Sequence, residues 1–264
     1  MSVPRHARSR GILRTLGGLR EGQRVATYVL VHGGGHGGWC YQPVARLLRS
    51  HGHEVYAPSL TGLGERAHLF ASDVDLDCHI TDIANLLHFE DLRDVILVGH
   101  SYGGMVITGA ADRAADRVGH LVYLDAATPD NGQTLVDQAP EMMAAARANG
   151  RIVDGVEMCL YPTDEILPYY GVRDADQLEW MKARLTPHPW KCFEQPLRLT
   201  NEAALARIPQ THLCTTLYMR WRDVDGLRRK ANGRLWDLDT GHDMMITEPV
   251  WVAEKLMLLA RGMR

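Results

Sequence analysis

The sequence contains no apolar run long enough to cross a membrane. Its uninterrupted apolar stretches, such as residues 28–31 and 256–260, fall far short of the roughly 20 residues that a bilayer requires. It also has no large excess of either charge, since 29 Lys and Arg residues face 32 Asp and Glu residues. A chain without a strongly basic surface has little to attract phosphate backbones or an anionic membrane. We therefore expect neither a nucleic acid nor a membrane as a partner.

Cysteine is scarce, and its spacing lacks the patterns that signal disulfides or metal sites. The five cysteines are odd in number and include no C-x-x-C pair; they are Cys40, Cys78, Cys159, Cys192 and Cys214. We predict free thiols in a reducing compartment, which favours the cytoplasm. We also expect no metal ion. Whether the protein acts alone or as a homodimer stays open.

The first 24 residues carry arginines against a single acid, Glu21. They contain no apolar segment of the kind that a secretory signal needs. We expect a loosely held basic leader over residues 1–24, and a transit peptide is the alternative.

Short β-branched segments alternate with segments of helical period in most of the chain. The predicted strands are residues 26–33, 53–60, 94–100, 120–126, 211–216 and 234–239, and the predicted helices are residues 41–52, 79–92, 105–118 and 249–262. This alternation predicts an α/β fold with a mostly parallel central sheet flanked by helices. From Asp130 to about Thr200 it disappears, and the segment is too long for a loop. We therefore divide the chain into a core, residues 25–129 and 205–264, and an inserted cap, residues 130–204.

The motif G-x-S-x-G at residues 99–103 lies between a predicted strand and a predicted helix. In this context it is typical of a nucleophile elbow, in which small residues permit a tight turn that exposes the serine. We predict that Ser101 is a nucleophile. The alternative is a glycine-rich turn whose serine has no catalytic role.

A second glycine-rich segment, VHGGGHGGW at residues 31–39, directly follows the first strong strand. Backbone N–H groups in such a turn can face a substrate oxygen and form an oxyanion hole with the residue after the nucleophile. We predict Gly34 and Tyr102 as the two donors. A phosphate-binding loop is not favoured, because the Lys-Ser/Thr ending of a P-loop is absent.

A serine nucleophile needs a base, and His242 is the one histidine placed in a turn after the last predicted strand. The other histidines are expected to be structural, with His36 and His100 beside the site. The acid that orients the base is ambiguous. Asp125, at the end of a predicted core strand, is one choice, Asp223 or Asp225 is another, and a triad without a normal acid is the third.

Five segments together resemble one branch of the α/β-hydrolase superfamily. They are VLVHGGGHGGWCY, HEVYAPSLTGLGERAHL, DVILVGHSYGGMVI, HLVYLDAATPDNG and DLDTGHDMMITEP. They are similar to bacterial carboxylesterases that include pyrethroid-hydrolysing enzymes, and more distantly to plant methylesterases and hydroxynitrile lyases. The resemblance covers residues 26–130 and 205–262. It implies an α/β-hydrolase fold, Ser101 and His242 as nucleophile and base, oxyanion donors at Gly34 and Tyr102, and no cofactor.

The sequence departs from these relatives at two places. Plant relatives carry an aspartate in the segment matching CTTLYMRW, where this chain has Leu217 and Tyr218 or their neighbours. The related lyases have a threonine matching Gly33 and a lysine directly after the catalytic histidine, where this chain has Asp243. A lyase needs a positive group for departing cyanide, and Asp243 would do the opposite. The sequence therefore favours ester hydrolysis.

We predict a serine carboxylesterase that hydrolyses small to medium apolar esters through an acyl-enzyme. Apolar and aromatic residues of the cap offer material for a pocket wall; they are Met142, Met143, Leu160, Tyr161, Tyr169, Tyr170, Trp180 and Trp190. The residues we predict to line the substrate pocket are Gly35, His36, Trp39, Tyr161, Trp180 and Trp190. Two alternatives remain, a lyase or other C–C cleaving enzyme and a catalytically weak ligand-binding protein on the same fold.

Overall fold

The structure is a computed structural model, and it describes residues 25–160, 167–220, 222–232 and 234–262. Its centre is a sheet of six strands in the order β2-β1-β3-β4-β8-β9, and every neighbouring pair is parallel. The strands are β1 (Thr27–Val31), β2 (Glu54–Tyr56), β3 (Val95–His100), β4 (Val118–Leu124), β8 (Gln210–Thr215) and β9 (Leu235–Leu238). The predicted α/β architecture with a parallel sheet is confirmed. The predicted strand at residues 53–60 is shorter than expected, because Pro58 cannot continue the ladder.

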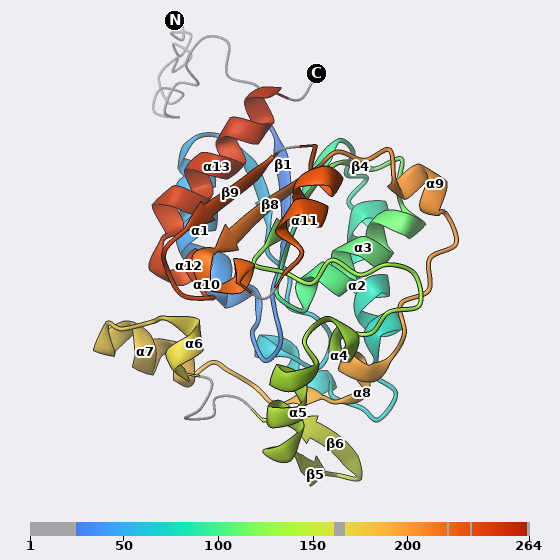
Figure 1. Ribbon diagram of the computed structural model, residues 1–264, viewed down its shortest axis with the longest axis vertical. Helices are drawn as coiled ribbons and strands as arrows, with labels where there is room; N and C mark the ends of the chain where they lie inside the picture. Colours follow the sequence, from blue (N-terminus) through green and yellow to red (C-terminus); the bar gives the residue numbers. More distant parts are fainter. Residues whose placement is uncertain (1–24, 161–166, 221, 233, 263–264) are drawn as a thin grey trace, which may run out of the picture.

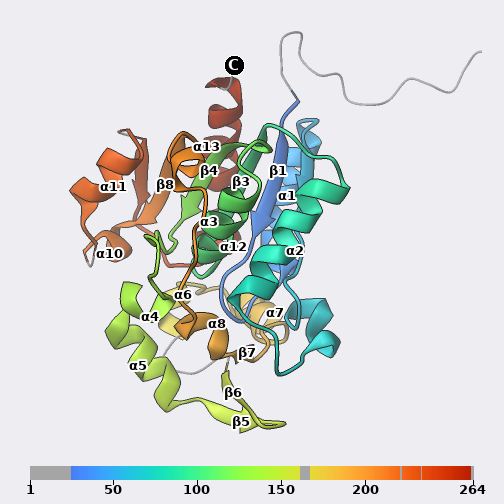
Figure 2. The same cartoon turned by 90° about the vertical axis from the view of Figure 1, so that its right-hand side faces the viewer.

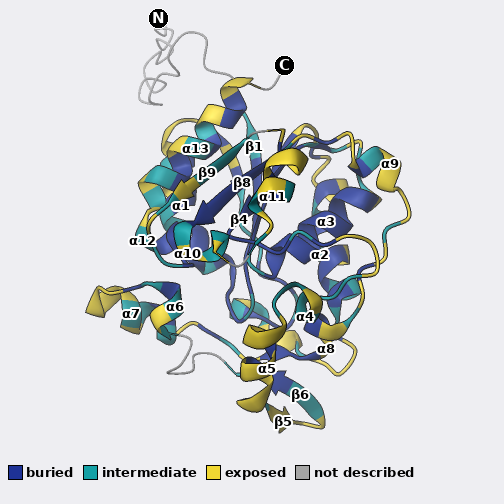
Figure 3. Cartoon of the chain, viewed as in Figure 1, coloured by how far each residue is buried: buried dark blue, intermediate teal, exposed yellow. Residues whose placement is uncertain are grey.

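The central strands are buried on both faces, as their continuous apolar sequences indicate. Successive side chains of a strand point to opposite faces. Tyr28 and Leu30 accordingly belong to one core cluster, and Val29 and Val31 belong to the other. Figure 3 shows these strands among the most deeply buried parts of the chain.

Helices cover the sheet on both sides. In Figure 1, α1 (Gln42–Ser50) and α13 (Pro249–Gly262) lie on one side, and α2 (Leu76–Phe89) and α3 (Gly103–Arg113) lie on the other. Helix α2 begins three residues earlier than predicted, because Asp75 caps it by accepting a hydrogen bond from the Cys78 N–H group.

The chain between β4 and β8 has elements of its own. They are α4 (Leu135–Gln138), α5 (Pro140–Ala148), β5 (Arg151–Val153), β6 (Val156–Cys159), α6 (Leu167–Tyr170), α7 (Ala175–Lys182), β7 (His188–Pro189), α8 (Lys191–Glu194) and α9 (Glu202–Leu205). Strands β5, β6 and β7 form a small antiparallel sheet. Figures 1 and 2 both show that most of this segment lies beyond one end of the central sheet.

The remaining elements are short. They are the 3-10 helices η1 (Gly38–Tyr41) and η2 (Gly64–Leu69) and the helices α10 (Thr216–Met219), α11 (Val224–Lys230) and α12 (Met244–Thr247). None of the helices in the described part of the chain has the length and apolar character needed to cross a membrane. The predicted leader, residues 1–24, lies outside the described residues.

Candidate active site

Ser101 lies in a sharp turn between β3 and α3. Its φ angle is +53°, a left-handed conformation that is uncommon for residues other than glycine. The flanking glycines allow this turn, because a Cβ atom on Gly99 would lie 2.5 Å from the Gly103 carbonyl oxygen. A Cβ atom on Gly103 would lie 2.7 Å from the Val31 carbonyl oxygen. The G-x-S-x-G segment therefore has the strand, turn and helix that its sequence predicts.

Asp125 directly follows β4, and its side chain is buried beside His242. Its Oδ2 atom lies 2.6 Å from Nδ1 of His242, and its Oδ1 atom accepts a hydrogen bond from the Thr215 N–H group at 2.8 Å. Since the carboxylate is an acceptor, Nδ1 of His242 is the donor. In the neutral imidazole, the proton on Nδ1 leaves Nε2 as an acceptor. Strands β4 and β8 are neighbours, so the sheet itself brings Asp125 to this position.

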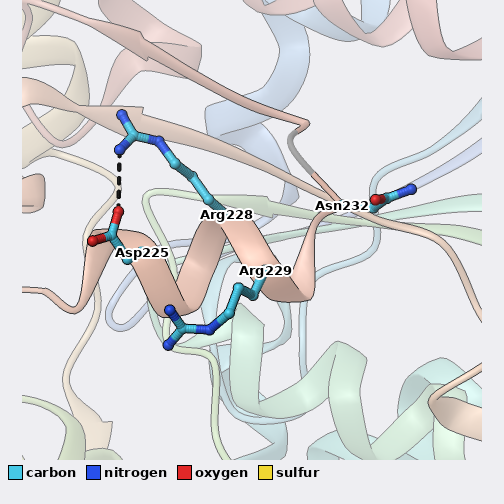
Figure 4. Close-up of a pocket in the computed structure, with 4 residues that line it drawn as sticks. All are labelled: Asp225, Arg228, Arg229 and Asn232. Atoms are coloured by element: carbon cyan, nitrogen blue, oxygen red, sulfur yellow. Dashed lines mark hydrogen bonds and ion pairs between the residues drawn. The ribbon is translucent and has the colours of Figure 1, made fainter.

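The alternative acids Asp223 and Asp225 lie elsewhere. Asp223 caps α11 by accepting a hydrogen bond from the Gly226 N–H group at 2.9 Å. Asp225 is exposed and lies 3.4 Å from Arg228, a pair that Figure 4 shows in an open surface hollow. Neither carboxylate contacts His242 in the described part of the chain, so the structure favours Asp125.

A cavity of about 600 Å³ contains Ser101, Asp125 and His242 in its wall. Apolar groups from α4, α5 and the chain around them form much of the rest; they are Leu135, Ala139, Pro140, Met142, Met143 and Ala146. Tyr169 and Tyr170 of α6 also line it. The ring of Tyr169 lies 4.5 Å from the His242 ring, between centroids. The segment between β4 and β8 thus encloses the end of the sheet that carries Ser101.

Of the predicted pocket residues, His36 lines this cavity. Gly35, Trp39, Trp180 and Trp190 do not, and packing explains each case. Trp39 and Trp180 contact each other edge to face, with centroids 5.1 Å apart. Trp190 is 2% exposed and packs on Phe193 instead. The Gly35 backbone bonds to residues of the β4–β8 segment rather than facing the cavity. Tyr161 lies outside the described residues.

The predicted oxyanion loop is held by a neutral histidine. Nε2 of His32 accepts a hydrogen bond from the Leu60 N–H group at 3.0 Å, so the ring proton of His32 lies on Nδ1. Nδ1 then donates to the Gly33 carbonyl oxygen at 2.8 Å. Burial lowers the pKa of His32 to about 3, which keeps it neutral. Because the Gly33 carbonyl and the Gly34 N–H belong to one planar peptide, this bond also fixes the direction of the Gly34 N–H.

Tyr102, the second predicted donor, precedes α3, and its ring is fully buried. Its hydroxyl donates to Nδ1 of His79 at 2.9 Å, because Nε2 of His79 donates to the Thr61 carbonyl oxygen. The Tyr102 side chain thereby anchors the turn after Ser101. The Tyr102 backbone N–H is the group that we predict to donate to the oxyanion.

A second buried pair, not predicted from the sequence, joins His36 to Asp243. Nε2 of His36 lies 3.0 Å from Oδ2 of Asp243, and Nδ1 lies 2.8 Å from the Gly34 carbonyl oxygen. Both ring nitrogens face acceptors, so His36 carries a proton on each and is a cation. Burial lowers the pKa of His36, but the Asp243 charge and the hydrogen bonds outweigh it, and the pKa is raised.

This pair changes the interpretation of Asp243. In the sequence, the negative charge of Asp243 stands where a lyase needs a positive one. In the structure, Asp243 is fully buried and paired with His36. Nε2 of His100 also lies 3.7 Å from Asp243 and donates to the His242 carbonyl oxygen at 3.1 Å. Asp243 therefore organises the loops around His242 and does not face the cavity.

One cluster in the described residues has the composition of a metal site, namely His79, His188 and Cys192. Hydrogen bonds already fix which ring nitrogens of His79 and His188 carry protons. His188 accepts from the Gly35 N–H group at Nδ1, so Nε2 carries the proton and cannot be a metal ligand. Nδ1 of His79 accepts from Tyr102. These side chains therefore fit a hydrogen-bonded support for the glycine loop better than a metal centre.

Comparisons with known proteins identify the family of this fold. The profile of the Alpha/beta hydrolase family matches residues 28–255. The chain is 36% identical over 252 residues to a carbendazim hydrolyzing esterase of Nocardioides sp., covering 89% of this chain and 100% of that protein. It is 37% identical over 112 residues to a pyrethroid hydrolase of Sphingobium wenxiniae, covering 42% of this chain and 39% of that protein. An extracellular alpha/beta-hydrolase from a Paenibacillus species is similar in structure, with a TM-score of 0.75, 23% identity, and coverage of 88% of this chain and 98% of that chain.

Proposed function

This chain belongs to the α/β-hydrolase family and is an esterase-type hydrolase, and on that premise we propose that it is a serine carboxylesterase. The fold and the resemblance predicted from the sequence are confirmed. The observation that carries the finer proposal is the juxtaposition of Ser101 with the buried Asp125–His242 pair in one cavity. A serine in a left-handed turn that shares a cavity with a paired histidine fits the arrangement that activates a weak hydroxyl nucleophile.

The mechanism follows from the donors and acceptors of these residues. Nε2 of His242 accepts the Ser101 hydroxyl proton as Oγ attacks the ester carbonyl carbon. Asp125 stabilises the imidazolium through Nδ1. The Gly34 and Tyr102 N–H groups donate to the tetrahedral oxyanion. The alcohol leaves with the proton from His242, and a water molecule activated by the same base then releases the acid from the acyl-enzyme.

The apolar wall of the cavity supports small to medium esters as substrates. Helix α5 contributes Met142 and Met143, and methionine side chains adapt to ligands of irregular shape. One relative is named a carbendazim hydrolyzing esterase and another a pyrethroid hydrolase, and on these names we extend small-molecule ester hydrolysis to this chain. The proposal includes no cofactor, since every step uses side chains and backbone N–H groups of this chain.

The test is steady-state hydrolysis of p-nitrophenyl esters of increasing acyl length. We expect turnover by the unaltered protein and a loss of about 10⁴-fold or more in kcat for Ser101→Ala. A phosphonate that reacts with activated serines should label the unaltered protein and leave Ser101→Ala unlabelled. Absence of both turnover and labelling would contradict the proposal and would favour a ligand-binding protein.

A lyase is the second candidate, and one observation weighs against it. The related lyases carry a threonine where this chain has Gly33. A Cβ atom on Gly33 would lie 2.8 Å from both the Ser101 Cβ and Nδ1 of His100. The loop is therefore built around glycine at this position. Aldehyde release from a cyanohydrin without ester hydrolysis would reverse this choice.

A further inference from the structure

Arg222 places a positive charge in the wall of the cavity that contains Ser101. It is half-buried and follows α10 in the chain. Among the residues that the structure describes, no carboxylate lies within 4.0 Å of its guanidinium nitrogens. Other arginines differ in this respect, since Arg117 and Arg147 lie 3.0 Å and 2.7 Å from their acidic partners.

The guanidinium group is held in one orientation by neutral partners. Nη2 donates to Thr128 Oγ1 at 2.6 Å and to Gln138 Oε1 at 3.2 Å. The guanidinium carbon lies 4.9 Å from the centre of the Tyr218 ring, an arrangement in which the ring face attracts the cation. Nη1 and Nε have no hydrogen-bond partner in the described part of the chain. The N–H groups of Nη1 and Nε thus remain for a ligand, and they lie on different edges of the guanidinium plane.

The other charged groups around the cavity have partners or lie in solvent. Asp125 accepts hydrogen bonds from His242 and Thr215. His36 is paired with the buried Asp243. Glu141, on the exposed side of α5, is the other acid in the wall, and no ion pair joins it to Arg222 in the described structure. The charge of Arg222 is therefore left without close compensation.

Arg222 also lies close to the catalytic end of the cavity. Thr128, its hydrogen-bond partner, is three residues beyond Asp125, and the intervening Ala127 donates its N–H to the Ser101 carbonyl oxygen. Burial raises the pKa of the Tyr169 phenol, and the positive charge of Arg222 opposes that rise. The Tyr169 ring packs on His242, and Tyr169, Ser101 and Arg222 all line the same cavity, so a ligand in it can lie between Ser101 and Arg222.

We propose that Arg222 is an anion subsite and that the preferred substrates are esters that carry a carboxylate in addition to the scissile ester. This inference rests on the proposed esterase function and names its substrate class. A carboxylate oxygen can accept a hydrogen bond from the N–H groups of Nη1, and the uncompensated charge adds attraction. The apolar wall then contacts the chain between the two groups.

A purely structural role for Arg222 is the competing explanation, because the side chain joins Thr128 to Gln138 at the end of α4. The two roles differ in their effect on substrates. Loss of a structural support lowers activity toward charged and neutral esters alike. Loss of a carboxylate subsite lowers activity toward the charged ester alone. The measurement must therefore compare matched esters within each variant.

The kinetic test uses methyl esters that differ in their terminal group. Monomethyl adipate is compared with methyl hexanoate, and monomethyl suberate with methyl octanoate, by methanol release. We expect Arg222→Gln to reduce the charged-to-neutral ratio of kcat/KM by about tenfold or more. Arg222→Lys should retain part of the preference, because it keeps the charge without the planar donors. Arg228→Gln, an equal charge change in the exposed hollow of Figure 4, should leave the ratio unchanged.

A binding measurement keeps this inference separate from the proposed function. Calorimetric titration of monomethyl suberate into Ser101→Ala should show binding that weakens about tenfold in Ser101→Ala/Arg222→Gln. A parallel fall for both esters in Arg222→Gln, or equal affinities of the two Ser101→Ala proteins, overturns the anion subsite while ester hydrolysis stands. Failure of the unaltered protein to hydrolyse any ester contradicts the esterase, and the titration still decides whether Arg222 binds the carboxylate.

Discussion

The Asp125 carboxylate lies 2.6 Å from Nδ1 of His242, although 117 positions separate the two residues in the chain. The contact depends on the order of strands in the sheet, because Asp125 directly follows β4 and the neighbouring β8 supplies the Thr215 N–H group that holds the carboxylate. His242 is fixed in turn by its backbone N–H, which donates to the Tyr169 carbonyl oxygen at 3.0 Å. The base is thus positioned from the sheet on one side and from α6 on the other.

Replacement of Asp125 by asparagine tests this relationship. An amide cannot stabilise the imidazolium, and it leaves the Nδ1 tautomer unspecified, so we expect kcat to fall by about 10³- to 10⁴-fold. The melting temperature checks that the variant folds. Asp225→Asn, on the exposed surface of α11, is the matched control and should retain full activity. Similar activities for the two variants would show that Asp125 is not the acid.

His32 provides a test of the oxyanion loop. His32→Phe preserves a planar ring but removes the hydrogen bonds to the Gly33 carbonyl and from the Leu60 N–H. The Gly34 N–H loses its fixed direction, so we expect kcat to fall by about 10- to 100-fold with little change in KM. Two buried backbone groups lose their partner, which costs about 1–3 kcal/mol each in the free energy of unfolding. A rise in KM at constant kcat would instead place His32 in substrate binding.

The positions of the core strands along the chain and the place of Ser101 could be predicted because both depend on local patterns. β-branched segments ended by glycine or proline indicate strands, and the glycines on both sides of Ser101 indicate a turn that side chains would obstruct. The end of β3 and the start of α3 follow from the same segment. The resemblance to known esterases is carried by these local motifs as well.

The partners of buried charges could not be predicted, because they depend on long-range packing. Asp125 was one of three candidate acids until the adjacency of β4 and β8 was known. His36 and Asp243 are 207 positions apart, and no sequence pattern signals their contact. Trp180 and Trp190 were expected in the cavity on hydrophobicity alone, but large aromatic residues serve equally well to attach one layer to another.

The His36–Asp243 pair makes stability dependent on pH. The pKa of His36 is raised above its ordinary value of 6.5 in the folded protein, so its contribution is complete below that value and is lost as the pH rises through the raised pKa. At pH 6 we expect the free energy of unfolding of the unaltered protein to be about 1–3 kcal/mol larger than that of His36→Gln. The reason is that glutamine keeps a hydrogen-bond donor but not the charge. Urea unfolding at pH 6 and pH 9 checks this, and the difference should shrink at pH 9. A constant difference would contradict the charge assignment.

Two adjacent methionines on α5 allow the cavity wall to be tested with a built-in control. Met143 is 5% exposed and Met142 is 45% exposed, yet both line the cavity. Met143→Ala removes buried contacts and enlarges the enclosed part of the cavity, so we expect a loss of about 2–5 kcal/mol in the free energy of unfolding. The p-nitrophenyl ester series should then show its maximum kcat/KM at a longer acyl chain. Met142→Ala opens space that solvent already reaches, so its acyl preference should stay that of the unaltered protein. Equal shifts of the preferred acyl length in the two variants would show that the enclosed wall formed by Met143 does not determine this preference.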